Sequence, residues 1–261
     1  MYQSGLADGL LRFAKIGFVA GLFSLALGWF VEKNDFPPSS RILPVLAQDP
    51  RQEPTSAPPF AVDFEGVRYQ VEPLYEYELW GLVVSMHHSD SWRDYHHKNS
   101  GDFLNVVDFC VVWGKNNALS GVYEKISFSS GQFTCFWKAS DPTIWNYFKN
   151  EEASNNHIVV ADQAIRRQIR KVRIGDQIHF RGQLVKYRHP KWTGFRSSST
   201  TRTDTGPGAC ETVFVRDFEI LKAGPRRGLM LRWIGGILTL ASILSFVAFF
   251  CLPERFYSSS Q

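Results

Sequence analysis

The chain has 261 residues, of which 44% are apolar and 15% aromatic, and this content excludes a chain that is disordered throughout. The formal net charge of +4 is too small to indicate nucleic-acid binding by itself. Four cysteines without a CxxC pair exclude a disulfide-dense secreted scaffold and give no support to a zinc ribbon or a thioredoxin-type site.

An uncharged apolar run, IGFVAGLFSLALGWFV, occupies residues 16–31 behind a short N-terminal segment of residues 1–15. A helix needs roughly 17 to 20 such residues to cross the hydrocarbon core, and Lys15 can extend this run by placing its ammonium group at the interface. A cleaved signal peptide is the alternative, because Arg12 and Lys15 resemble its positive region. The small residue that cleavage requires, Ala47, lies far beyond the run, so we predict an uncleaved transmembrane helix.

A proline-rich stretch follows at residues 32–59, where the prolines are mixed with serine, glutamine and aspartate. Such a composition lacks the apolar content to pack and predicts an extended, semi-rigid linker.

Residues 60–222 carry mainly strand patterns and form the predicted folded domain. Three strand-like stretches come first, an amphipathic helix follows, and two further strands end the domain; they lie at about 75–85, 105–114, 125–137, 161–172, 177–188 and 211–221. This order resembles the OB-fold, a small five-stranded barrel with a helix between its third and fourth strands. The resemblance is one of element order alone and implies a mainly β, OB-like barrel with one or two helices, with a β-sandwich as the alternative.

Four of the seven histidines lie in one short stretch, MHHSDSWRDYHHKNSGD, at residues 86–102. Neutral imidazoles together with a carboxylate suit Zn²⁺, Cu²⁺ or Ni²⁺. Adjacent histidines on a regular strand point to opposite faces, so they can share a metal only from an irregular loop, which the serine, asparagine and glycine residues predict here. The candidate ligands are His87, His88, Asp90, Asp94, His96 and His97. The alternative is a solvated loop, and the sequence indicates no other cofactor.

The cysteines allow one disulfide within the predicted domain. Cys110 and Cys135 fall on neighbouring predicted strands, so we predict that they pair if the domain lies outside the cytoplasm, which leaves Cys210 free. The alternative is buried thiols. A cysteine nucleophile with a histidine base is a third interpretation, but it needs a spatial pairing that the sequence does not show.

A long polar loop at residues 189–210 mixes cations with an aromatic residue. The residues of a possible binding loop are Lys191, Trp192, Arg196 and Arg202. OB barrels bind ligands with such loops, whereas a flexible hairpin tip is the alternative. The basic stretch RRQIRKVR in the predicted helix is typical of a nucleic-acid reader or of an ordinary solvated helix face.

A second uncharged run, residues 233–252, is long enough to span a membrane. A basic juxtamembrane linker, residues 223–232, precedes it, and a C-terminal tail, residues 253–261, follows it. The charges before the first run place the N-terminus in the cytoplasm, those before the second run argue the reverse, and the first helix usually dominates. We therefore expect a two-pass protein of the bacterial inner membrane, with both termini cytoplasmic and a periplasmic domain.

The chain contains no phosphate-binding loop, no GxSxG elbow and no HExxH motif. The leading hypothesis is a non-enzymatic, membrane-anchored binding or scaffolding subunit of the cell envelope, whose partners are the membrane and another envelope protein. The alternatives are a metal-binding protein or metalloenzyme that uses the histidine stretch, and a nucleic-acid-binding OB module. The last requires a cytoplasmic domain, so nucleic acid is not an expected partner of a periplasmic one.

Overall fold

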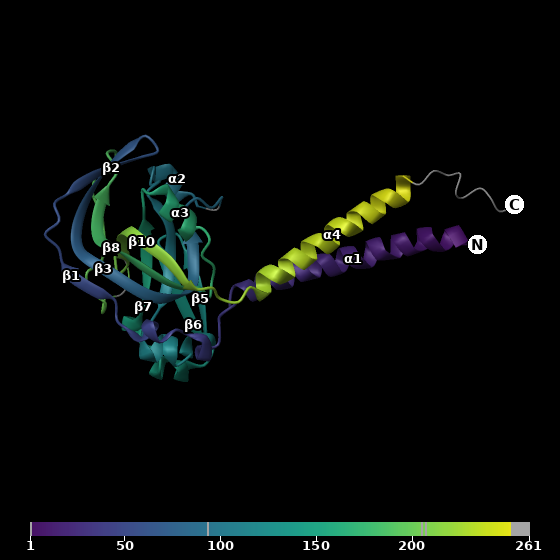
Figure 1. Ribbon diagram of the computed structural model, residues 1–261, viewed down its shortest axis with the longest axis horizontal. Helices are drawn as coiled ribbons and strands as arrows, with labels where there is room; N and C mark the ends of the chain where they lie inside the picture. The colour runs from purple at the N-terminus through teal and green to yellow at the C-terminus, as the bar shows by residue number, and fades with distance from the viewer. Residues whose placement is uncertain (1, 93, 205, 207, 252–261) are drawn as a thin grey trace. The chain divides into compact units, whose positions relative to one another are not determined.

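The computed structural model describes residues 2–92, 94–204, 206 and 208–251 (Figure 1). It divides into two compact units, of which one contains Met1–Asp35 with Arg226–Gln261 and the other contains Phe36–Pro225. The predicted C-terminal tail, residues 253–261, lies outside the described residues.

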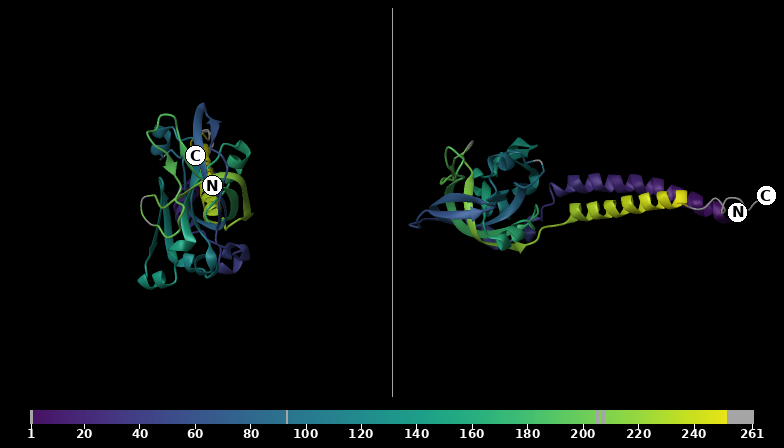
Figure 2. Two further views of the ribbon diagram at one scale, coloured as in Figure 1. Left: turned by 90° about the vertical axis from the view of Figure 1, so that its left-hand side faces the viewer. Right: turned by 90° about the horizontal axis from the view of Figure 1, so that it is seen from above.

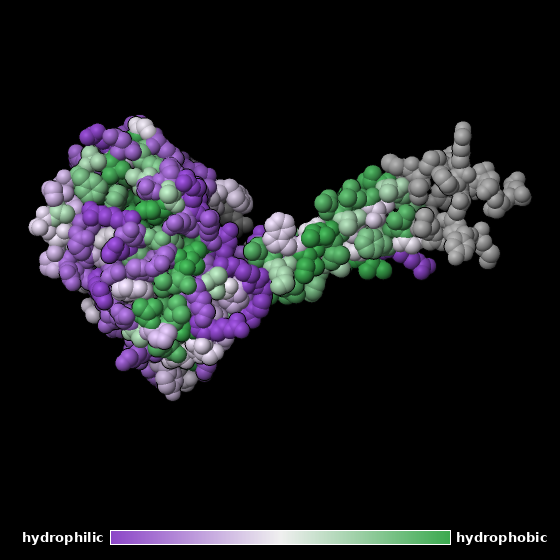
Figure 3. All heavy atoms as spheres, in the orientation of Figure 1, coloured by the Kyte–Doolittle hydropathy of each residue, from purple (hydrophilic) through white to green (hydrophobic). Residues whose placement is uncertain are grey.

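Two helices that lie side by side make up the first unit, α1 (Tyr2–Glu32) and α4 (Arg227–Cys251) (Figure 1, Figure 2). A Cβ atom added at Gly21 of α1 would lie 2.9 Å from the backbone oxygen of Gly235 in α4, so the missing side chain permits their close approach. Both helices are long and apolar enough to cross a membrane. Figure 3 shows hydrophobic side chains on the outer surface of the pair, which is compatible with a membrane protein.

Both helices begin earlier than the sequence predicted. α1 already includes residues 2–15, and α4 begins at Arg227, so it contains most of the predicted basic linker. Pro225 precedes α4 and no proline interrupts residues 226–251, so nothing in the sequence stops the helix from including these polar residues.

The second unit is mainly β, which confirms the predicted class. Within a mixed sheet, a ring of strands runs in the order β3, β4, β7, β10, β8 and back to β3. Neighbouring strands of the ring are antiparallel, apart from β7 and β10, which are parallel. The ring strands are β3 (Val67–His88), β4 (Asn105–Val112), β7 (Ala153–Val159), β8 (Gln177–Arg188) and β10 (Glu211–Lys222).

Shorter elements complete this unit. β1 (Arg51–Pro54) and β2 (Phe60–Phe64) pair with β3, and β9 (Arg196–Ser197) pairs with β8. β5 (Ile126–Gly131) and β6 (Thr134–Ala139) form a separate hairpin. The two short α-helices are α2 (His96–Ser100) and α3 (Gln163–Ile169). The predicted helix is α3, and its first turn is capped by the Asp162 carboxylate, which accepts hydrogen bonds from the amides of Ala164 and Ile165.

Strand β4 shows how the two sides of the ring are covered, because all of its residues are buried. Val107, Phe109 and Val111 belong to the apolar cluster built by the ring strands. The residues between them, Asp108 and Cys110, point the other way, as alternation in a strand requires, and they meet the β5–β6 hairpin. The hairpin therefore converts an outward face of the sheet into a second interior.

Two features of this unit differ from the prediction. The stretch 125–137 is not a ring strand but most of the β5–β6 hairpin, and the third ring strand is β7, whose sequence ASNNHIV is too polar to give an apolar alternation. Residues 36–59 are not an extended linker, since they form the short turns η1 (Ser39–Arg41) and η2 (Pro44–Ala47) and strand β1. Leu46 is fully buried there, because the apolar residues between the prolines join the core.

Candidate active site

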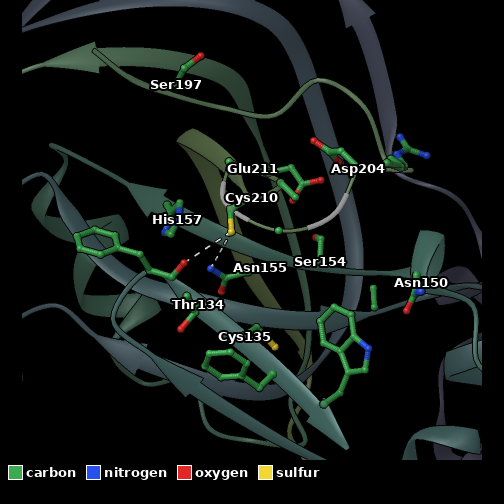
Figure 4. Close-up of a pocket in the computed structure, with 18 of the residues that line it drawn as sticks. Thr134, Cys135, Asn150, Ser154, Asn155, His157, Ser197, Asp204, Cys210 and Glu211 are labelled. Atoms are coloured by element: carbon green, nitrogen blue, oxygen red, sulfur yellow. Dashed lines mark hydrogen bonds between the residues drawn. The ribbon is translucent and has the colours of Figure 1, made fainter. Parts of the chain in front are cut away.

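A pocket of about 700 Å³ lies where β7, the beginning of β10 and the β5–β6 hairpin meet (Figure 4). Aromatic rings and small polar groups both line it, which is typical of small-molecule sites. The polar and aromatic residues of its lining include Trp113, Asn155, His157, Cys210 and Glu211.

The register of three adjacent strands brings the polar residues of this site together. Asp108 of β4 lies opposite His157 of β7, and β7 pairs in parallel with the beginning of β10, where Asn156 lies opposite Glu211. Cys210 directly precedes β10 and therefore lies beside Asn155. Side chains two residues apart on a strand share a face, so Asn155 and His157 both face Cys210. Figure 4 shows the Cys210 sulfur between these two side chains.

A short hydrogen bond connects the histidine to the aspartate. His157 Nδ1 donates to Asp108 Oδ1 at 2.7 Å, and the same oxygen accepts from Asn105 Nδ2 at 3.0 Å. The second carboxylate oxygen accepts from the backbone amide of Phe133 at 3.0 Å. Asp108 is thus held by three donors and fixes the orientation of the imidazole ring.

The cysteine contacts the same group of residues. Asn155 Nδ2 donates to Cys210 Sγ at 3.4 Å, and Sγ lies 3.7 Å from the carbonyl oxygen of Phe133. Cys210 is partly exposed and is the free cysteine among the residues whose side chains the structure describes. A nucleophile, an imidazole and a carboxylate that orients the ring form the arrangement that activates thiols in cysteine enzymes.

Electrostatics favour a charged imidazole at this position. Burial alone would lower the pKa of His157. The negative charge of Asp108, together with the side-chain hydrogen bonds to Asp108 and Cys210, outweighs burial and raises this pKa to about 10. Burial would likewise raise the pKa of Asp108, but the charge of His157 and the hydrogen bonds hold it below its usual value. The pair is therefore an imidazolium and a carboxylate at neutral pH.

The β5–β6 hairpin covers this pair of side chains. Phe133 lies at the hairpin tip with a φ of 62°, in the left-handed region that non-glycine residues rarely adopt, and its ring centroid lies 5.8 Å from that of His157. A disulfide joins Cys110 of β4 to Cys135 of β6, with their Cα atoms 5.8 Å apart. Cys110 lies two residues from Asp108 on β4, so the disulfide links the hairpin to the strand that carries Asp108.

The histidine stretch is brought partly into a buried network beside the site. Asp94 Oδ2 accepts from His87 Nε2 at 2.8 Å and from His97 Nδ1 at 2.7 Å, and the His97 amide donates to Asp94 Oδ1 at 2.9 Å. Burial raises the pKa of Asp94, but these hydrogen bonds outweigh it and lower the pKa. His97 Nε2 accepts from Asn105 Nδ2 at 2.9 Å, so the network continues to Asp108.

The other three candidate ligands lie outside this network. Asp90 forms a 2.8 Å ion pair with Arg170, His96 is exposed on α2, and burial lowers the pKa of His88. Within the described part of the chain, no group of three His, Cys, Asp or Glu side chains has an arrangement that could hold a metal ion.

The predicted binding loop is anchored along part of its length. The Arg196 guanidinium forms an ion pair with Asp102 and lies between the rings of Phe133 and Trp192, 4.4 and 4.6 Å from their centroids. Trp192 Nε1 donates to the Ser100 carbonyl at 2.7 Å. Of the four residues singled out in the sequence, Arg202 also lines the pocket, whereas the Lys191 side chain is exposed.

Sequence reasoning did not find His157, Asp108 or Asn155. The signal that was present is the polar composition of β7, NNHIV, in a strand that is buried almost throughout. A buried polar strand is unusual and points to a site. Comparison with protein-family models, with curated proteins and with solved structures finds no match to this chain.

Proposed function

We propose that this chain is a membrane-anchored, cysteine-dependent hydrolase or acyltransferase with Cys210 as its nucleophile. The observation that carries the proposal is that Cys210 and His157 line the same large pocket, with Asn155 Nδ2 donating to Cys210 Sγ and His157 Nδ1 held by buried Asp108. Structural cysteines are usually inert in apolar surroundings, whereas reactive ones lie partly exposed beside a cation, as Cys210 does.

The proposed reaction proceeds in two steps. The Cys210 sulfur first attacks an acyl carbon and forms the S–C bond, while the π electrons of the carbonyl group move to its oxygen. The carbonyl double bond then re-forms, and the leaving group departs with a proton from His157. Water or an acceptor nucleophile, losing its proton to His157, then attacks the thioester, which releases the acyl group and restores the thiolate and the imidazolium. Asp108 orients the ring throughout, and Asn155 Nδ2 is placed to donate to the developing oxyanion.

We also propose that the ring of strands is an OB-like barrel. Three observations support this: the ring order β3, β4, β7, β10, β8, the parallel pairing of β7 with β10, and helix α3 between β7 and β8 in the chain. The β5–β6 hairpin would then be an insertion between the second and third strands that builds the pocket.

The same proposal places the domain in the periplasm of a bacterial inner-membrane protein, with both termini in the cytoplasm. The Cys110–Cys135 disulfide supports this orientation, because such bonds persist in oxidising compartments. A topology reporter fused after Gln261 tests it, and an extracytoplasmic signal would instead favour the nucleic-acid alternative with a cytoplasmic domain.

Thiol alkylation tests the proposed nucleophile. The full chain is purified in detergent with Cys251→Ser, so that Cys210 is the reactive thiol, and its alkylation by iodoacetamide is followed by mass spectrometry from pH 5 to 9. We expect Cys210 at pH 6 to react at least about tenfold faster than glutathione and His157→Gln to lose this advantage, since ordinary thiols ionise near pH 8.5. The exposed His96→Gln is the matched control and should not change the profile.

A profile identical to that of glutathione and insensitive to His157→Gln would overturn the proposal. The binding or scaffolding role, with another envelope protein held by the pocket and the 189–210 loop, would then be the better account. The metal-dependent alternative would require a stoichiometric Zn²⁺, Cu²⁺ or Ni²⁺ ion that depends on the histidine stretch.

A further inference from the structure

The β5–β6 hairpin forms a second layer over part of the ring of strands. β5 lies on β3, where the hydroxyl oxygens of Ser85 and Ser130 are 2.6 Å apart, and β6 lies on β4, where the disulfide joins Cys110 to Cys135. The ring continues beyond β4 with β7, but the second layer ends at β6. Residues of both β6 and β7 line the pocket, so it occupies the place where the next strand of the second layer would lie (Figure 4).

The edge of β6 on the side of this pocket has no strand beside it. Within the described residues, β6 pairs with β5 alone. In an antiparallel ladder, every second residue directs its N–H and C=O groups to the partner strand, and the residues between direct theirs to the other side. The two-residue loop 132–133 makes Gly131 and Thr134 the first hydrogen-bonded pair, so Cys135 and Trp137 present their main-chain groups at the free edge. Both residues line the pocket and are partly exposed.

The part of β6 in the pocket lacks the features that normally protect a strand edge. Proteins place charged residues, proline or a bulge at such an edge, or they cover it. Thr134–Trp137 contains neither a charge nor a proline, and its pairing with β5 is regular. Phe136 lines the pocket although 61% of its surface is exposed. An open, uncharged edge in a pocket wall is what an extended peptide recognises when it adds a strand to a sheet.

The proposed nucleophile lies at one end of this edge. Cys210 Sγ is 3.7 Å from the carbonyl oxygen of Phe133, the residue directly before β6 (Figure 4). A peptide strand bound along Thr134–Trp137 would therefore lead its main chain past the sulfur, and each residue of that main chain contains a carbonyl carbon. The pocket volume of about 700 Å³ is within the range that holds small ligands, so it suits a segment of a few residues.

We propose that the pocket binds a peptide substrate in extended conformation, as a third strand beside β6, with main-chain hydrogen bonds to Cys135 and Trp137. This inference rests on the proposed function, because it assigns the substrate of Cys210. The S–C bond forms at a carbonyl carbon of the bound peptide, the peptide C–N bond breaks, and the amine departs with a proton from His157. Main-chain hydrogen bonds supply the affinity in this binding mode, so acyl groups without amides, such as fatty acyl groups, would be poor substrates.

Three peptide probes test this binding mode. Acetyl-Ala-Ala-Ala-Phe chloromethyl ketone alkylates a thiol by forming an S–C bond and expelling chloride, and two isomeric analogues carry one N-methyl group, on the second or on the third alanine. The N–H groups of successive strand residues point to opposite sides, so only one analogue loses a hydrogen bond to β6. The rate of Cys210 alkylation in the full-length Cys251→Ser protein is measured by intact mass spectrometry. Each rate is divided by the rate of the same probe with glutathione, which removes its intrinsic reactivity.

We expect one N-methyl analogue to react at least about tenfold more slowly than the unmodified probe, since it cannot form the hydrogen bond to β6 and its methyl group meets the strand edge. The other analogue is the matched control and should stay within about threefold of the unmodified probe. Losses in both analogues, or in neither, would overturn the binding mode.

Hydrogen exchange of the β6 amides gives an independent readout. The amides of Cys135 and Trp137 should exchange at least about tenfold more slowly in protein alkylated by the unmodified peptide probe than in protein alkylated by iodoacetamide. The amide of Phe136 bonds β5 in both adducts and is the internal control. Equal exchange in the two adducts would overturn the proposal. Protection of these amides in the free protein, together with a dimeric mass in detergent, would assign the edge to a second copy of this chain and overturn it as well.

The outcomes separate the two proposals. Fast alkylation by iodoacetamide at pH 6, together with equal normalised rates of the three peptide probes, would overturn the peptide strand and leave the nucleophile standing. Alkylation of Cys210 no faster than that of glutathione by all four reagents would overturn the proposed function itself. Every comparison uses protein with an unchanged β6, so none depends on whether a variant of this strand folds.

Discussion

Removal of the Cys110–Cys135 disulfide is expected to lower the free energy of unfolding by about 3.5 kcal/mol. The bond joins residues with a sequence separation of 25. In the chain-entropy model, closing a loop of this length removes about 12 cal/mol/K from the unfolded chain, or about 3.5 kcal/mol at 25 °C. The double variant Cys110→Ala, Cys135→Ala is compared with the parent protein by urea unfolding in mild detergent, followed by tryptophan fluorescence.

The same variant tests whether the disulfide positions the site. The amide of Phe133 donates to Asp108, so its hydrogen exchange should become faster when the hairpin is no longer tied to β4. The low-pH alkylation of Cys210 should weaken, because Asp108 loses one of its three donors. A loss of stability below about 1 kcal/mol would refute the loop-closure reasoning. Unchanged exchange at Phe133 would refute the positioning role of the hairpin.

The buried polar groups give three more expectations. Glu211 has a folded pKa raised to about 7 from 4.5, so its contribution to stability is fully present below about pH 4.5 and is lost as the pH rises through 7. We expect the wild-type free energy of unfolding to fall by about 3 kcal/mol more than that of Glu211→Gln over this window in urea titrations, and parallel curves would contradict the burial argument. His97→Ala should cost about 2 to 3 kcal/mol, because it removes one hydrogen-bond partner from each of the buried residues Asp94 and Asn105. His96→Ala at the exposed neighbouring position should cost less than about 0.5 kcal/mol. The stabilities of the two variants are compared by thermal unfolding, and equal losses of stability would contradict the role of His97 in the network. If the histidine stretch serves this network, elemental analysis of protein purified without a histidine tag should find less than about 0.1 transition-metal ion per chain. A bound ion that is lost when His87, His88, His96 and His97 are all changed to Ala would instead support the metal alternative.

Local pattern alone determined the two apolar helices, the mainly β class and helix α3. These features follow from short-range properties of the chain, namely uncharged runs long enough to span a membrane and apolar residues that recur every second or every fourth position. The apolar runs did not define the first residues of these two helices. The polar residues that precede each run contain no helix breaker, so the helix begins before the run.

The site was decided by tertiary structure. Asp108, His157 and Cys210 are far apart in the chain and meet only because β4, β7 and β10 are neighbours in the ring with one particular register. A shift of one residue would turn each side chain to the other face, and no local pattern encodes that register. The polar residues that let β7 carry the site also gave it no apolar alternation from which a strand could be predicted. The burial that raises the pKa of Glu211 exists only once distant segments enclose this residue.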